Sequence, residues 1–170
     1  KLQNRILIPK LSSSQGIPPE QTRSVSLDLA LTSRCPLSCR YCTVEKGPTR
    51  ELTSRKWNEV IRSIAGLKSI ELISLEGGEP FLREDLPEIL ASALRHARRV
   101  KIVTGGSVPS RLPDSLVFDP RFHFEVSLDG PAPIHNFLRD QSYPQAFHFL
   151  RACLRAGIRV RFRTVISRHN

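Results

Sequence analysis

Strand-like and helix-like segments alternate along most of this chain, and that alternation limits the folds it can adopt. Five apolar or alternating segments predict β-strands, at residues 25–31, 69–75, 100–104, 122–128 and 158–166. Apolar residues at helical spacing predict helices whose amino-terminal caps are Thr53, Asp85 and Ser142. Strands joined by helices or long crossovers build a parallel sheet from right-handed βαβ units. The predicted fold class is therefore α/β.

The polar residues of the last two strands indicate a barrel with a wet lumen. Parallel strands covered on both faces are continuously apolar, whereas here every second residue is polar. In the fourth strand these are His123, Glu125, Ser127 and Asp129, and in the fifth Arg159, Arg161 and Arg163. The three arginines fit two interpretations: lumen residues that favour a substrate with carboxylates or phosphates, or cations that protect a sheet edge from pairing.

Composition restricts location and partners. Residues 1–24 are rich in Pro, Ser and Gly and are expected to be a leader with little regular structure, followed by one domain over residues 25–170. Without an apolar run of about 18 residues or a signal peptide, a cytoplasmic protein without membrane contact is expected. A net charge of +10 suits a solvated basic surface or an anionic partner, but aromatic residues make up only 6%, which disfavours nucleic acid as a partner.

Three of the four cysteines follow the first predicted strand closely. Cys35, Cys39 and Cys42 are too near one another for a disulfide framework, so they indicate metal binding. Thiolates are the soft ligands that iron–sulfur clusters need, and three ligands leave one iron open to a small molecule. Zinc and three unrelated buried thiols stay as alternatives. Cys153 lies on the apolar face of a predicted helix and is expected to be a core residue.

Residues 31–42, LTSRCPLSCRYC, resemble the signature of the radical S-adenosylmethionine (SAM) superfamily, including the aromatic Tyr41 before the third cysteine. The resemblance covers roughly residues 25–170 and is nearest to the subgroup that matures peptides or assembles cofactors, the SPASM/twitch-like enzymes. It implies a [4Fe-4S] cluster on Cys35, Cys39 and Cys42, with SAM on the open iron. It also implies a TIM-like (β/α)6 barrel, here a partial one truncated after the fifth strand.

The motif Gly77-Gly78-Glu79-Pro80 ends the second predicted strand. Paired glycines let a ligand approach the backbone, and Glu79 offers an acceptor for an ammonium group, although such a sequence is also a common turn. The resemblance makes it the family's GGE motif, which contacts the methionine amino group of SAM. Glu76 stands where a small hydroxyl residue is expected.

Two more motifs end the third and fourth predicted strands, where such folds bind ligands. Thr104-Gly105-Gly106 lies where members of the resembled family often have a Thr-Asn-Gly segment. A flexible turn is an equal alternative for these residues. Ser127-Leu128-Asp129-Gly130 resembles a family segment whose Ser and Asp lie near the SAM ribose, with the downstream Arg139 near the SAM carboxylate. His135 and Asn136 could equally be surface residues.

Together these features predict a radical SAM enzyme that cleaves SAM reductively to a 5′-deoxyadenosyl radical and takes hydrogen from a peptide or small-molecule substrate, with an anionic substrate as one option. A reductase, flavodoxin or ferredoxin would supply the electron. A non-catalytic cluster- or SAM-binding module or truncated remnant, and a zinc-stabilised nucleic-acid-binding protein, are the alternatives. The predicted cofactor-binding residues are Tyr41, Gly77, Gly78, Glu79, Pro80, Thr104, Ser127, Asp129 and Arg139.

Overall fold

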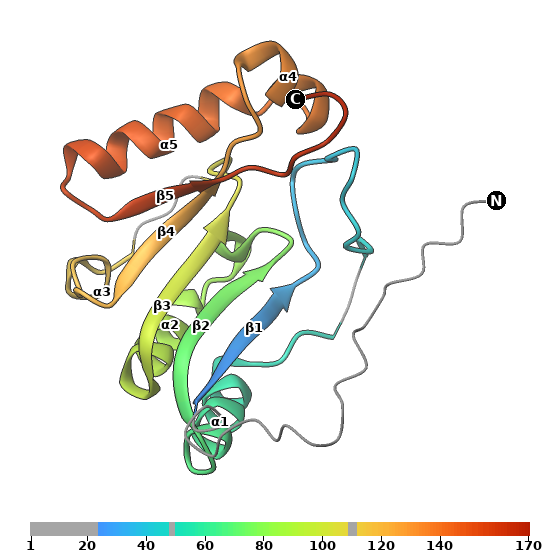
Figure 1. Ribbon diagram of the computed structural model, residues 1–170. Helices are drawn as coiled ribbons and strands as arrows, with labels where there is room; N and C mark the ends of the chain where they lie inside the picture. Colours follow the sequence, from blue (N-terminus) through green and yellow to red (C-terminus); the bar gives the residue numbers. More distant parts are fainter. Residues whose placement is uncertain (1–23, 48–49, 109–111) are drawn as a thin grey trace, which may run out of the picture.

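A five-stranded parallel sheet is the centre of the molecule. The computed structural model describes residues 24–47, 50–108 and 112–170. The strands lie side by side in chain order (Figure 1): β1 (Ser24–Thr32), β2 (Ser69–Gly77), β3 (Ala97–Thr104), β4 (Phe122–Ser127) and β5 (Val160–Arg163). Because each crossover adds the next strand on the same side, the sheet follows the barrel pattern rather than the doubly wound one, in which strand order reverses. The predicted parallel α/β fold is confirmed as a partial barrel.

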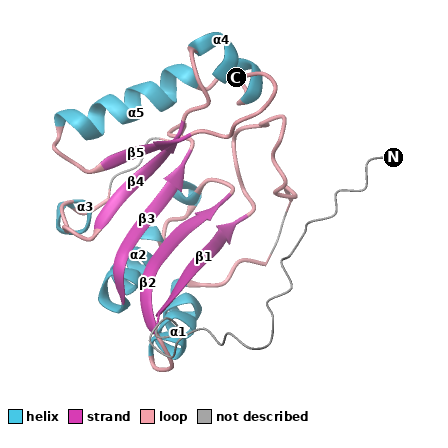
Figure 2. Ribbon diagram, viewed as in Figure 1, coloured by secondary structure: helices cyan, strands magenta, loops and turns pink. Residues whose placement is uncertain are grey.

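Three helices pack on the apolar face of the sheet (Figure 2): α1 (Ser54–Ala65), α2 (Leu86–His96) and α5 (Tyr143–Arg155). Shorter elements follow strand ends: the 3-10 helix η2 (Pro80–Leu82), α3 (Asp114–Val117) and α4 (Ala132–Leu138). Helices α3 and α4 were not predicted from the sequence. No helix in the described part of the chain is long and apolar enough to cross a membrane.

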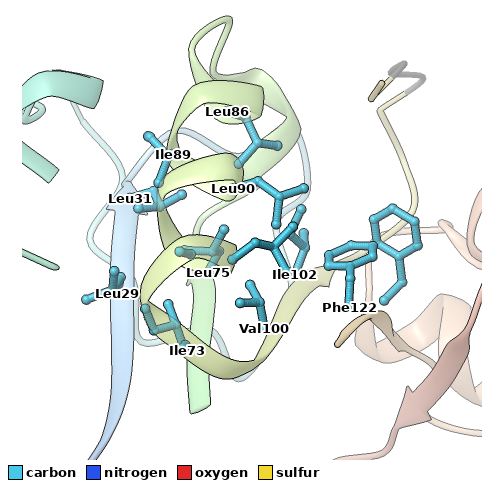
Figure 3. Close-up of a cluster of buried hydrophobic side chains, with 14 of the residues drawn as sticks. Leu29, Leu31, Ile73, Leu75, Leu86, Ile89, Leu90, Val100, Ile102 and Phe122 are labelled. Atoms are coloured by element: carbon cyan, nitrogen blue, oxygen red, sulfur yellow. The ribbon is translucent and has the colours of Figure 1, made fainter. Parts of the chain in front are cut away.

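The register of the sheet lines up its apolar residues between the strands and the helices. One row crosses all five strands and consists of Leu29, Leu75, Ile102, Phe124 and Val160. The α2 residues Leu86, Ile89 and Leu90 cover this face and are almost fully buried (Figure 3). Burying such side chains contributes about 1.5–3 kcal/mol each, so the sheet and α2 form the stable base from which the strand ends project.

The opposite face of the sheet is polar, as the alternation predicts. Lys101 of β3 pairs with Glu125 of β4 at 3.1 Å, and both side chains are mostly buried. Arg163 of β5 lies 3.5 Å from Glu125 and 3.9 Å from Glu76 of β2. A contact from β5 to β2 crosses three strand spacings, about 14 Å in a flat sheet, so the sheet curves. Arg159 donates instead to the carbonyl of Pro120.

Several predicted element ends need correction. β5 covers only Val160–Arg163 of the predicted residues 158–166. Asp85 and Ser142 do precede helices, but neither side chain caps its own helix. The Asp85 carboxylate accepts from the backbone N–H of Ser54 (2.9 Å) and so caps α1. Thr53 caps α1 as predicted. The predicted leader, residues 1–24, lies outside the described residues except for Ser24, which begins β1.

Candidate cofactor site at the carboxyl edge of the sheet

The arrowheads of the strands point toward the edge where the first part of the cysteine loop lies (Figure 1). The cysteine loop is residues 33–53, of which the structure describes 33–47 and 50–53. This loop joins β1 to α1 and carries Cys35, Cys39 and Cys42. The turns after β2, β3 and β4 end at the same edge. Parallel strands place their following turns together in this way, and the predicted site residues therefore converge from distant parts of the sequence.

The three loop cysteines are free thiols with unequal exposure. Cys35 and Cys39 are partly buried and Cys42 is exposed. Burial raises the pKa of Cys35 and of Cys39, and the charge of neighbouring cysteines acts in the same direction, while Lys46 opposes it. In the described residues, no three His, Cys, Asp or Glu side chains converge as they do around a single metal ion. The loop contains no histidine, and its three thiols are the soft donors that iron–sulfur clusters take.

The two glycines after β2 lie directly against the start of the cysteine loop. The N–H of Gly78 donates to the carbonyl of Thr32 (2.7 Å), and that of Glu79 to the carbonyl of Arg34 (2.8 Å). A Cβ at Gly78 would lie 2.1 Å from the Arg34 oxygen, and one at Gly77, whose φ is +128°, would lie 2.4 Å from the Thr32 oxygen. The close approach that the glycines permit is thus made by the chain itself, and it fixes the backbone just before Cys35.

Glu79 is a buried carboxylate at the centre of the site. Its oxygens accept from the Thr104 hydroxyl (2.9 Å), the Gly105 N–H (3.0 Å) and the Phe81 N–H (3.3 Å). Burial nevertheless raises the pKa of Glu79, and no ion pair of the described residues includes it. The structure thus brings together two predicted residues, Glu79 and Thr104, and Pro80 is buried beside them at the start of η2.

Asp129 forms a second polar centre, after β4. It is fully buried and accepts from the Tyr41 hydroxyl, from Arg139 Nε (2.5 Å) and from the backbone N–H of Val165 (2.9 Å). Burial by itself would raise the pKa of Asp129, but these hydrogen bonds and the Arg139 charge lower it overall. Burial and the bond to Asp129 raise the pKa of Tyr41. Tyr41, Asp129 and Arg139, all predicted site residues, are therefore in direct contact.

His135 holds the backbone of Asp129, a role that was not predicted from the sequence. Its Nδ1 accepts from the Asp129 backbone N–H (3.2 Å), and its Nε2 lies 3.1 Å from the Ser142 hydroxyl. Ser142 in turn donates to the Arg139 carbonyl (2.6 Å). Because Nδ1 accepts, the imidazole is neutral, and burial lowers its pKa. Leu138, three residues later and also buried, gives the helical spacing that could have indicated the buried face of α4.

The cysteine loop is attached to both polar centres. Its tip lies on the end of α4, where the Arg40 N–H donates to the Leu138 carbonyl (2.9 Å) and the Ser38 N–H donates to Asp140 (2.9 Å). The charge of Glu79 acts on Cys35, and the charge of Arg139 acts on Cys39. Cys35 is therefore within range of the Glu79 carboxylate, and Cys39 within range of the Arg139 guanidinium.

Ser127 is the remaining predicted residue. It is buried at the last position of β4 and pairs in register with Arg163, so it lies on the polar face that carries Glu125. Cys153 is buried in the apolar core, as predicted, and burial raises its pKa to about 11.

Comparison with known proteins identifies the family. The family model of the radical SAM superfamily matches residues 29–170. The chain belongs to the radical SAM superfamily. Among curated radical SAM relatives, the PqqA peptide cyclase of Ruegeria pomeroyi is 34% identical over 72% of this chain and 34% of its own length. The pre-heme d1 synthase of Dinoroseobacter shibae is 32% identical over 82% of this chain and 36% of its own length. The chain thus spans about a third of the length of these relatives.

Solved structures agree with this radical SAM assignment at the level of the fold. Streptococcus suis SuiB bound to the precursor peptide SuiA superposes with a TM-score of 0.72 at 16% identity, over 84% of this chain and 33% of SuiB. The enzyme anSMEcpe with bound AdoMet gives a TM-score of 0.67 at 17% identity, over 85% of this chain and 44% of that one.

Proposed function

We propose that this chain is the cluster- and SAM-binding part of a radical SAM enzyme, with residues 25–170 as one domain. Cys35, Cys39 and Cys42 would hold a [4Fe-4S] cluster. In a [4Fe-4S] cluster each thiolate binds a different iron, so the three sulfurs lie further apart than around a single zinc ion. A zinc ion binds each of its sulfur ligands at about 2.3 Å. When bound, the cluster and SAM supply an electron and a 5′-deoxyadenosyl radical that abstracts a hydrogen atom from the substrate.

The protein residues bind and orient. Glu79, buried and without a cationic partner among the described ion pairs, would accept the methionine ammonium group of SAM. By the family resemblance, Arg139 would lie near the SAM carboxylate and Ser127 and Asp129 near the SAM ribose. Tyr41, which donates to Asp129, would hold the Asp129 carboxylate in place. The observation that carries the proposal is that the three-thiol loop contacts both an anion and a cation, and an amino acid moiety needs both kinds of partner together. The Glu79 N–H donates to the Arg34 carbonyl of the loop (2.8 Å), and Tyr41 of the loop shares Asp129 with Arg139.

A peptide is the substrate we propose for the complete protein. A relative is named PqqA peptide cyclase, and a structural neighbour was solved with its precursor peptide. An anionic peptide would suit the net charge of +10. A reductase, flavodoxin or ferredoxin is proposed as the electron donor, and a cytoplasmic location would keep the cluster reduced.

The decisive experiment is SAM cleavage by the reconstituted chain. The protein is loaded with iron and sulfide without oxygen, reduced with dithionite and mixed with SAM, and 5′-deoxyadenosine is measured. We expect product from the parent chain and from the control Cys153→Ala, whose thiol lies in the core, but neither iron–sulfur absorbance nor product from Cys39→Ala. A cluster without product would favour a non-catalytic binding module, and tight zinc in a colourless protein would contradict the proposal.

A further inference from the structure

Arg83, which follows η2, is a buried cation that donates to groups around the two ends of the cysteine loop. Its side chain is only 4% exposed. Nη1 donates to the Leu31 carbonyl (2.8 Å) and to Glu51 (3.3 Å), Nη2 to the Leu52 carbonyl (2.8 Å) and to Asp85 (2.8 Å), and Nε to Asp85 (2.9 Å). A guanidinium has five N–H donors, so these five bonds use all of them.

Three of the five hydrogen bonds of Arg83 go to the two ends of the cysteine loop, and the other two go to Asp85, which accepts from the Ser54 N–H at the start of α1. Leu31 is the second-last residue of β1, immediately before the loop, whereas Glu51 and Leu52 precede α1. Residues 31–34 and 51–54 are called here the loop neck. Glu51 reinforces it by accepting from the Thr32 hydroxyl and from Arg34 Nε (2.9 Å). The neck is thus closed by one buried arginine and two carboxylates, Glu51 and Asp85.

The hydrogen bonds of Arg83 offset the entropy that is lost when the two ends of the loop are held together. Bringing the ends of a long loop together costs conformational entropy, and each residue held in one backbone state adds to that cost. Charge-assisted hydrogen bonds from a buried guanidinium offset it. Lysine cannot replace the arginine, because an ammonium group has three donors on a single nitrogen and cannot hold two carbonyls and two carboxylates that lie on different sides.

We propose that Arg83 is a positioning residue that closes the loop neck, so that the three thiols are presented together before the cluster is assembled. The inference rests on the proposed function, since it concerns assembly on that loop. Arg83 touches none of the three cysteines in the hydrogen bonds of the described residues, and its effect passes through Leu31, Leu52 and Glu51. The closure itself can be measured without any metal.

Hydrogen exchange on the metal-free full chain tests the closure. In Arg83→Lys, amides of residues 33–47 should exchange about ten-fold faster or more, the change expected when one charge-assisted hydrogen bond is lost. Strands β2, β3 and β4 should keep their protection. The matched control is Arg121→Gln, which removes a paired arginine that also donates to a carbonyl, that of Leu94, away from the loop; its loop exchange should equal that of the parent.

Cluster loading with chemical rescue separates positioning from general folding. Arg83→Ala should bind at least five-fold less iron and sulfide per chain than the parent. Methylguanidinium should restore loading and the iron–sulfur absorbance, whereas methylammonium at the same concentration should not, because only the former carries the forked donors. Unchanged loop exchange, loss of strand protection together with the loop, or equal effects of the two cations would overturn the proposal. A parent chain that binds no cluster would refute the proposed function while leaving the exchange result valid.

Discussion

Asp129 and Glu79 are both buried carboxylates, yet their surroundings shift their pKa values in opposite directions. Burial would raise the pKa of Asp129, but donors from Tyr41, Val165 and Arg139 lower it. Burial prevails at Glu79 and raises its pKa, despite donors from Gly105 and Thr104. Asp129 is therefore satisfied within the protein and acts as an anchor for the cysteine loop. Glu79 has no cationic partner among the described ion pairs, and a bound ammonium group would compensate its charge.

A neutral His135 should make stability depend on pH. Its folded-state pKa lies below the unfolded value of about 6.5, because of burial and the nearby Arg139. Below that unfolded value the unfolded chain binds a proton that the folded chain rejects, so stability falls as the pH decreases. Denaturant unfolding between pH 8 and pH 5 should show this loss. In His135→Gln, which keeps an acceptor and a donor, stability at pH 8 should fall by about 1–2 kcal/mol and the pH dependence should flatten.

The lowered pKa of His123, which arises from burial and nearby cations, keeps part of the slope in that variant. If the free energy of unfolding of His135→Gln depended on pH as steeply as that of the parent, His135 would not be the neutral group that its contacts imply.

Gly78 tests the backbone contact that fixes the start of the loop. A methyl group there would lie 2.1 Å from the Arg34 oxygen, a contact between two backbone segments that no side-chain rotation relieves. Gly78→Ala should therefore lower the free energy of unfolding by about 1–3 kcal/mol and reduce the iron bound on reconstitution. Thermal unfolding and iron analysis measure both effects.

Gly66 is the matched control for that substitution. It follows α1 with φ −71°, and an added Cβ would meet only the Ser63 and Arg62 oxygens at 3.5 and 3.6 Å. Gly66→Ala should be neutral or stabilising by about 0.4–1 kcal/mol. If both substitutions behaved alike, the tight contact at Gly78 would not be a property of the protein in solution.

At the scale of elements, the sequence predicted what periodic patterns encode and missed what tertiary contacts decide. The phase of β1 was evident because Leu29 and Leu31 alternate with exposed Asp28 and Ala30. The short helix α4 was not predicted, because a seven-residue helix gives little periodic signal. The side chain of Asp85 was assigned to its own helix but caps α1, which lies far from it in the sequence.

The candidate site followed the same division. The placement of Cys35, Glu79 and Asp129 at one edge of the sheet was predictable, because each of them follows the end of a predicted strand. The roles of His135 and Arg83 were not, since each depends on carbonyl or N–H groups from other elements that only the folded chain brings near. Motif spacing predicts candidate ligand residues more readily than it predicts the residues that position them.

Helix α2 is the element whose packing should matter most for stability. Leu90 is fully buried against the sheet, whereas Leu67, just after α1, is 81% exposed. Leu90→Ala should lower the free energy of unfolding by about 2–5 kcal/mol, because it removes buried contacts and leaves a cavity. Leu67→Ala should change it by less than about 0.5 kcal/mol. Equal losses in chemical denaturation would contradict the assignment of the core.

For the molecule as a whole, sequential strand order places every functional turn at one edge of a curved sheet. The cysteine loop, the Gly77–Pro80 turn and the Asp129 segment meet there although nearly a hundred residues separate the first from the last. In the part of the chain that the structure describes, the helices pack on the apolar face and none covers the polar face with its ion pairs (Figure 2). This division of faces explains how a radical SAM chain can combine a dry core with a polar interior.

Mössbauer spectroscopy of the chain reconstituted with 57Fe, recorded with and without SAM, tests the central claim most directly. Three thiolates on a four-iron cluster leave one iron without a protein ligand. The account predicts that SAM changes the signal of one iron in four and leaves the other three as they were. A spectrum in which SAM alters no iron, or in which no four-iron cluster forms on Cys35, Cys39 and Cys42, would contradict it.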